Sequence, residues 1–173
     1  MINPSEILHG KILIVDDQEA NVLLLDRILR GAGYDSITST MDPGSVCELH
    51  RKNSFDLILL DLEMPGDAYS GFQVMEDLKK VETEYFLPVI VITAHPGHKL
   101  HALQSGARDF ISKPFDLTEV LARVHNMIEV RLLHVAANSR ISALEHKLEE
   151  VEAGNKLPGR QSDEPATIFS ATD

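Results

Sequence analysis

Short runs of aliphatic residues that end at polar residues constrain the fold of this chain more than any other feature. Three of them are unbroken and four residues long: residues 12–15, 57–60 and 89–92. A run of this length between turn signals is typical of a strand buried on both faces, as in a parallel sheet. The shorter run Phe110-Ile111 and a strand-like segment at residues 36–40 extend the pattern. The sequence therefore predicts a parallel sheet at the core.

Helical patterns separate the strand-like runs. Apolar spacing and the positions of Gly and Pro predict four helices before the last one: residues 19–30, a helix opened by Asp42-Pro43, residues 72–80 and residues 99–104. Such alternation implies right-handed crossovers between parallel strands, and therefore an α/β fold.

Length and composition narrow the class of protein. The 173 residues, 43% of them hydrophobic, are enough for one domain with additional elements. The net charge of −11 argues against direct nucleic-acid binding. The single cysteine, Cys47, excludes an internal disulfide and fits a reducing compartment. There is no signal-peptide pattern at the start and no apolar run of membrane-spanning length, so we expect a cytoplasmic protein without membrane contact.

Acidic residues stand where two of the apolar runs end. Asp16 and Asp17 follow the first run, and Asp61 follows the run at residues 57–60. Ligands of open α/β sheets bind outside the carboxyl ends of the strands, so we expect these carboxylates to gather there. Their mutual repulsion is relieved by a hard cation, and Mg²⁺ keeps waters that a substrate phosphate can replace. The pattern predicts a Mg²⁺ site that receives a phosphoryl group.

Two further polar residues end strand-like runs. Thr93 closes the run at residues 89–92, and Lys113 follows Phe110-Ile111 and precedes Pro114. A hydroxyl and an ammonium group at neighbouring strand ends can both bind phosphoryl oxygens.

These residues together resemble the signature set of response-regulator receiver domains. The matching motifs are Asp16-Asp17, Asp61 with Met64-Pro65, Thr93-Ala94 and Lys113-Pro114-Phe115, and the match covers about residues 10 to 130. The resemblance implies a flavodoxin-like, doubly wound α/β fold with a five-stranded parallel sheet in the order 2-1-3-4-5.

The resemblance also implies roles for the residues of the site. Asp61 would attack the phosphoryl group of a phosphohistidine and form an aspartyl phosphate. Asp17, Asp61 and the backbone carbonyl of Glu63 would ligate Mg²⁺ directly, and Asp16 would act through metal-bound water. Lys113 would pair with Asp61 before phosphorylation and with a phosphoryl oxygen afterwards. The donor would be a histidine kinase or a histidine phosphotransfer protein.

The resemblance also implies that two residues change position when the chain is phosphorylated. The hydroxyl of Thr93 would bind the phosphoryl oxygen, and Phe110 would move inward with it. The simpler interpretation of Phe110 is an ordinary core aromatic. The peptide bond Lys113–Pro114 is a candidate for the cis form, which the family uses.

Two segments depart from the usual receiver pattern, and two residues lie at positions where receivers vary. Glu63 lies two residues past Asp61 and could order or obstruct an attacking water, whereas His95 is read most simply as a solvated loop residue. Residues 66–70 enlarge the loop beside Asp61, and the segment 93–106 is short.

The last helix is predicted to be longer than a receiver needs. Asp116-Leu117-Thr118-Glu119 resembles a capping box, and no Pro or Gly follows until Gly154. Its distal half can be read as heptads, with Met127, His134, Ile141 and Leu148 at a and Val130, Ala137, Leu144 and Val151 at d. We expect a parallel homodimeric coiled coil; the alternative is a solvated helix that frays in isolation.

We therefore expect a receiver domain at residues 1–130, a helical extension at 131–153 and a disordered tail at 154–173. Such a chain would not be an enzyme, because no catalytic domain follows. Its output protein is not identified by the sequence. Two alternatives remain open: a regulatory subunit that acts on a cyclic-di-GMP enzyme in another chain, and a phosphate sink or dimerisation module.

Overall fold

A computed structural model describes residues 2–64, 70–81 and 86–154 of the chain. Its centre is a five-stranded parallel sheet in the order β2-β1-β3-β4-β5. The strands are β1 (Ile12–Val15), β2 (Ile37–Thr40), β3 (Leu57–Asp61), β4 (Val89–Thr93) and β5 (Asp109–Ser112). The predicted fold class and strand order are confirmed.

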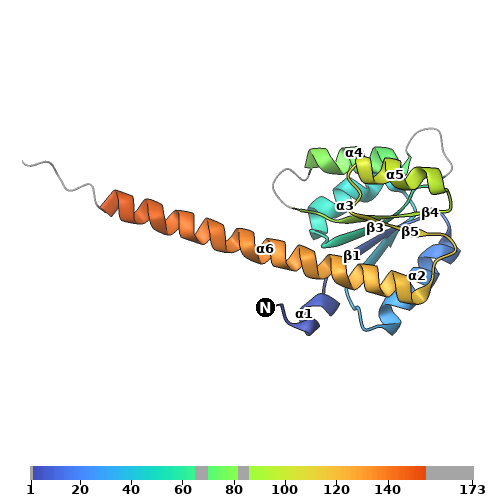
Figure 1. Ribbon diagram of the computed structural model, residues 1–173, viewed down its shortest axis with the longest axis horizontal. Coiled ribbons are helices and arrows are strands. Elements are labelled where there is room, and N and C mark those ends of the chain that lie inside the picture. The colour runs from blue at the N-terminus through green and yellow to red at the C-terminus, as the bar shows by residue number, and fades with distance from the viewer. Residues whose placement is uncertain (1, 65–69, 82–85, 155–173) are drawn as a thin grey trace, which may run out of the picture. The chain divides into compact units, whose positions relative to one another are not determined.

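Helices cover both faces of the sheet (Figure 1). They are α1 (Pro4–Leu8), α2 (Glu19–Gly31), α3 (Val46–Asn53), α4 (Gly71–Val81), α5 (Pro96–Gln104) and α6 (Leu117–Gly154), with the 3₁₀ turn η1 (Pro43–Ser45) before α3. Side chains of α1, α2 and the first part of α6 share one core cluster, and those of α3, α4 and α5 share the other.

The apolar runs are unbroken because both faces of the sheet are buried. Successive side chains of a strand point to opposite faces, so Ile12 and Ile14 enter the α2 side while Leu13 and Val15 enter the α4 side. All residues of β1, β3 and β4 are buried, whereas β2 at the sheet edge is only partly covered. The edge position explains why β2 lacks an aliphatic run.

Most predicted helices are found within one residue of their expected bounds; two begin elsewhere, and one helix was not predicted. α5 begins at Pro96 rather than at residue 99, because Pro is well accommodated at the first helical position. Asp42 caps the turn η1, and the helix α3 begins only at Val46. The short helix α1 was not expected; Asn3 forms its capping box with Glu6, and its Ile7 is buried in the core.

Helix α6 begins with one half of the predicted capping box. The carboxylate of Asp116 accepts a hydrogen bond from the Glu119 N–H at 3.0 Å, whereas the Glu119 carboxylate binds Arg123 at 2.9 Å. Farther along, Arg131 is buried: its guanidinium donates to the carbonyl of Phe86 and lies 3.7 Å from a carboxylate oxygen of Asp56. These contacts fix the first part of α6 to the amino-terminal end of the sheet.

The chain divides into two compact units, Met1–Asn138 and Ser139–Asp173, and the helical residues of α6 belong to both. The proposed tail beyond Gly154 and the enlarged loop, with Pro65, lie outside the described residues apart from Ser70. Within the described ranges, no helix is both long and apolar enough to cross a lipid bilayer.

The first residue of α4 packs against the end of β3 and generates a stability prediction. A Cβ atom on Gly71 would lie 2.7 Å from the carbonyl oxygen of Asp61 and 2.9 Å from the Cα of Leu62. Because both neighbours are backbone atoms, we expect Gly71→Ala to lower the free energy of unfolding by about 1–3 kcal/mol. Urea denaturation followed by circular dichroism measures this change.

Gly31, at the end of α2, is the matched control. A Cβ atom there would meet nothing within 4 Å, so Gly31→Ala should leave stability unchanged or raise it by up to about 1 kcal/mol. Equal urea midpoints for Gly71→Ala and the wild-type protein would contradict the tight approach of α4 to β3.

Candidate functional site

The carboxyl ends of four neighbouring strands bring the predicted site residues together. Asp16 and Asp17 follow β1, Asp61 ends β3, Thr93 ends β4 and Lys113 follows β5. The register is continuous across the sheet, since Val15 pairs with Leu60, Asp61 with Ile92 and Thr93 with Ser112. The strand ends are therefore level, and polar side chains separated by up to 97 positions meet at one edge.

The three aspartates form a compact acidic cluster. One carboxylate oxygen from each of Asp16, Asp17 and Asp61 lies within 4.8 Å of the others. Asp16 and Asp61 are buried, and Asp17 is half-buried. Burial raises the pKa of Asp16, and the charge of Asp61 acts in the same direction, although the hydrogen bond from the Gln18 N–H opposes them.

Asp16 and Asp17 differ in what surrounds their oxygens. Asp16 accepts hydrogen bonds from the backbone N–H of Gln18 at 2.8 Å and from the side-chain amide of Asn21 at 3.0 Å. The Oδ1 of Asp17 is buried and has no hydrogen-bond partner among the described residues. A buried carboxylate oxygen without a donor fits a site that ligates a hard cation such as Mg²⁺. Asn21, on the first turn of α2, was missed by sequence reasoning.

Asp61 is held by two donors. The ammonium group of Lys113 lies 2.8 Å from Asp61 Oδ2 and 3.8 Å from an oxygen of Asp16. The backbone N–H of Glu63 donates to Asp61 Oδ1 at 3.0 Å. The Lys113–Pro114 peptide bond is cis, as expected from the resemblance.

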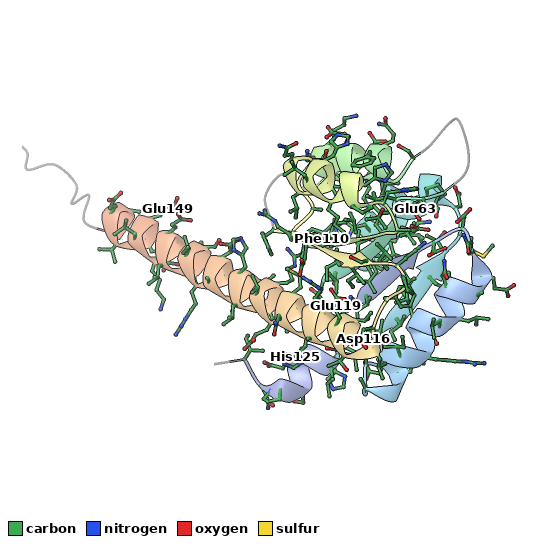
Figure 2. The ribbon with its side chains drawn as sticks, turned by 45° about the vertical axis from the view of Figure 1, so that its right-hand side comes forward. Glu63, Phe110, Asp116, Glu119, His125 and Glu149 are labelled. Carbon is green, nitrogen blue, oxygen red and sulfur yellow. The ribbon has the colours of Figure 1, made fainter. Side chains whose placement is uncertain are left out.

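The side chain of Glu63 binds Thr93 at the end of β4. The Thr93 hydroxyl donates to Glu63 Oε1 at 3.0 Å, and the same oxygen accepts from the backbone N–H groups of Ala94 and His95. Partial burial acts to raise the pKa of Glu63, but the hydrogen bonds from Ala94 and Thr93, together with the nearby Lys113 and His95, outweigh it and hold the pKa below its usual range. Glu63 is labelled in Figure 2. No sequence signal indicated this contact.

Phe110 lies on β5, half-buried against the core cluster of α4 and α5 (labelled in Figure 2). The ammonium of Lys99 is 4.9 Å from its ring centroid, and the guanidinium of Arg123 is 5.6 Å away. Asp109 binds Arg123 at 2.6 Å and so fixes one of these two cations. These contacts suit an ordinary aromatic residue of the core, and the role of Phe110 as a switch residue stays a prediction.

The histidines near the site contact one another and Phe72. The rings of His95 and His98 are 5.1 Å apart, and His101 stacks on Phe72 at 4.3 Å. Among the described residues, the acidic cluster is the one group in which three metal-ligating side chains converge.

The sequence matches known response-regulator proteins over most of its length. The family model of the response regulator receiver domain matches residues 12–125. Response regulator PleD of Caulobacter vibrioides is 38% identical over 128 residues, which are 73% of this chain and 28% of PleD. The transcriptional regulatory protein YkoG of Bacillus subtilis is 35% identical over 117 residues, covering 66% of this chain and 49% of YkoG. The chain therefore spans less than half of either relative.

Solved structures show the same architecture. The receiver domain of NtrX from Brucella abortus aligns with a TM-score of 0.63 and 28% identity, over 69% of this chain and 98% of that domain. A response regulator structure from Chloroflexus aurantiacus aligns with a TM-score of 0.62 and 27% identity, over 70% of this chain and 98% of that one. Together with the family match, these likenesses place the chain in the receiver-domain family of two-component response regulators.

Proposed function

We propose that this chain accepts a phosphoryl group on Asp61 from a phosphohistidine of a histidine kinase or a phosphotransfer protein, with the help of Mg²⁺. One observation carries the proposal: a fully buried carboxylate, Asp61, pairs with Lys113 at 2.8 Å beside an unpartnered oxygen of Asp17. Cys47 cannot form a disulfide within the chain, so a reducing, cytoplasmic setting belongs to this proposal.

In the proposed transfer, an Asp61 oxygen forms a bond to phosphorus as the phosphorus–nitrogen bond of the phosphohistidine breaks. The electron pair of the broken bond leaves on the imidazole nitrogen, which takes up a proton. The chain itself supplies mainly positioning and charge. Lys113 stays beside the transferred group and pairs with one of its oxygens, and the Thr93 hydroxyl donates to another.

The residues around Asp61 fit a single Mg²⁺ ion. Asp17, Asp61 and the carbonyl of Glu63 would hold it, while Asp16, fixed by Gln18 and Asn21, would bind through water. When bound, the ion would neutralise charge on the transferring phosphoryl oxygens.

The distal part of α6 supports a second element of the proposal, a parallel homodimer. Four apolar side chains at a and d positions are more than half exposed: Ile141 (52%), Leu144 (66%), Leu148 (61%) and Val151 (64%). Burying one leucine contributes about 1.5–3 kcal/mol, so pairing these layers between two copies can support association.

Charges beside the seam favour two parallel copies. Arg140 and Lys147 occupy g positions, and Glu145 and Glu152 occupy e positions. In a parallel pair, each g cation faces the e glutamate of the partner five positions onward. In an antiparallel pair, g would face g and e would face e, which places like charges together.

Trans-acting control of a cyclic-di-GMP enzyme is the alternative proposal, supported by the similarity to PleD, which covers the receiver region and 28% of PleD. If the chain is instead a phosphate sink, phosphorylation changes no protein–protein contact. That outcome distinguishes a phosphate sink from the homodimer and from control of a cyclic-di-GMP enzyme.

Phosphorylation of Asp61 is directly testable. Incubation with radiolabelled acetyl phosphate and Mg²⁺ should label the wild-type chain, and Asp61→Asn should abolish labelling because the amide is not a nucleophile here. Asp26→Asn is the control, since Asp26 lies on the surface of α2 and pairs only with Arg30 among the described contacts. Equal label in Asp61→Asn and the wild type would exclude Asp61 as the acceptor.

Mg²⁺ affinity should depend more on Asp17 than on Asp16. We expect Asp16→Asn to weaken binding about tenfold, as is usual for groups that orient ligands, and Asp17→Asn to weaken it further because a direct ligand is lost. Isothermal titration of each variant with Mg²⁺ measures both changes. If Asp17→Asn binds as tightly as the wild type, the proposed coordination is wrong.

The dimer can be tested with full-length variants. The wild type should sediment as a dimer at micromolar concentration, and Leu144→Glu combined with Leu148→Glu should sediment as a monomer. Glu149→Lys is the control because position b lies outside the seam (Glu149 is labelled in Figure 2).

Charge reversal tests the parallel arrangement. Arg140→Glu with Lys147→Glu should not self-associate, and neither should Glu145→Lys with Glu152→Lys, but an equimolar mixture of the two double variants should form a heterodimer. A wild type that remains monomeric at high micromolar concentration contradicts the proposed coiled coil.

A further inference from the structure

Glu63 places a carboxylate on three donors at the end of β4. Its Oε1 accepts from the Thr93 hydroxyl at 3.0 Å, from the Ala94 N–H at 2.7 Å and from the His95 N–H at 3.2 Å. The ring of His95 adds a nitrogen 3.8 Å from the same oxygen. One carboxylate oxygen thus accepts from a hydroxyl and two consecutive backbone amides, of which the His95 N–H also donates to the Thr93 hydroxyl oxygen at 3.0 Å.

These donors form an anion-binding nest, which we define as the Thr93 hydroxyl with the N–H groups of Ala94 and His95. Successive backbone N–H groups that converge on one point bind anionic oxygens, whether of carboxylates or of phosphoryl groups. The proposed function assigns the Thr93 hydroxyl to a phosphoryl oxygen on Asp61. A carboxylate and a phosphoryl oxygen cannot occupy the nest together, because both are anionic and need the same donors.

Glu63 contacts Asp61 through its backbone and the nest through its side chain. The backbone N–H of Glu63 binds Asp61 Oδ1 at 3.0 Å, while its side chain reaches across to the neighbouring strand β4. Since β3 and β4 are adjacent, this one residue spans the gap between the proposed acceptor and the nest. The side chain is thereby held where an incoming phosphoryl group would place its oxygens.

We infer that Glu63 is an intramolecular competitor of the phosphoryl group: its carboxylate fills the nest in the unphosphorylated chain and leaves it when Asp61 is phosphorylated. The inference rests on the proposed function. The Glu63 side chain has a positioning role, because it holds the Thr93 hydroxyl and the Ala94 N–H in place, whereas its backbone N–H donates to Asp61.

Competition has a measurable consequence. When a site is competent in only a fraction of molecules, the apparent dissociation constant rises in inverse proportion to that fraction. Removing the competitor should therefore tighten binding of a phosphoryl mimic. If the nest is free in about a fifth of wild-type molecules, the gain is about fivefold.

Three full-length variants distinguish occupancy of the nest by the Glu63 carboxylate from the effect of its negative charge alone. Glu63→Ala removes the carboxylate, whereas Glu63→Asp keeps the charge but shortens the side chain by one methylene, so that it no longer reaches the nest. Both should bind beryllofluoride, in the presence of saturating Mg²⁺, about fivefold more tightly than the wild type. Glu76→Gln, which removes a surface carboxylate paired with Lys79 on α4, should bind as the wild type does. If Glu63→Asp behaves like the wild type and only Glu63→Ala gains affinity, simple charge repulsion explains the effect and the competition is overturned.

A second readout does not depend on phosphoryl chemistry. In the unphosphorylated chain without Mg²⁺, the amide proton resonances of Ala94 and His95 should move upfield in both Glu63 variants, because each loses a hydrogen bond to a carboxylate. The shift of His95 should be the smaller one, since its N–H also donates to the Thr93 hydroxyl oxygen at 3.0 Å. Unchanged resonances, in a protein whose wild type binds beryllofluoride, overturn the inference and leave the proposed function intact. A wild type that does not bind beryllofluoride overturns the proposed function and the competition with it.

Discussion

The ion pair between Asp61 and Lys113 is the interaction on which the site depends. A fully buried carboxylate is costly unless a cation and hydrogen bonds compensate for its lost hydration. Lys113 supplies the charge at 2.8 Å, and the Glu63 N–H supplies a hydrogen bond. The pair also joins β3 to the loop after β5, two segments between which β4 lies. A site of this kind requires level strand ends, and the register of the sheet provides them.

The other two aspartates of the acidic cluster and the anion-binding nest lie on opposite sides of Asp61 in the order of strands. On the β1 side, Asp16 and Asp17 concentrate negative charge suited to a cation. On the β4 side, Thr93 and two backbone amides offer donors suited to an anion. A phosphoryl group on Asp61 would meet both requirements at once, because its oxygens bind Mg²⁺ and accept hydrogen bonds. Glu63 contributes a carboxylate to the anion side in the unphosphorylated chain.

Helix α6 has two different surfaces along its length. Val120, Val124 and Ile128 are buried in the core beneath the sheet, and Arg131 extends this attachment through Asp56 and the Phe86 carbonyl. Apart from Leu117 at its start, the exposed large apolar side chains of α6 begin with Val130 and Leu133. One stripe of the helix thus packs on the receiver core, and the proposed homodimer would use another.

The sequence by itself predicted the strands of the sheet, most of its helices and the polar residues that stand at the strand ends. Unbroken aliphatic runs of four residues between turn signals are typical of strands covered on both faces, and Asp16, Asp61 and Thr93 stand at strand ends because they adjoin or close these runs. The cap at Asp116 was readable for the same local reason: its partner is three residues away. The helix α1 escaped detection because five residues show too little periodicity, and its stability comes from burying Ile7 in the core.

Only the tertiary structure decided which distant side chains meet. The Glu63 carboxylate and the Thr93 hydroxyl are 30 positions apart, and nothing in their spacing indicates a contact. They meet because β3 and β4 are neighbours in register, which places the residue after one strand beside the end of the next. The buried Arg131 depends in the same way on Asp56 and Phe86, which α6 reaches only after packing on the sheet. Local patterns specify strands and caps because they act within a few residues, whereas the charge balance of the site depends on strand order and register.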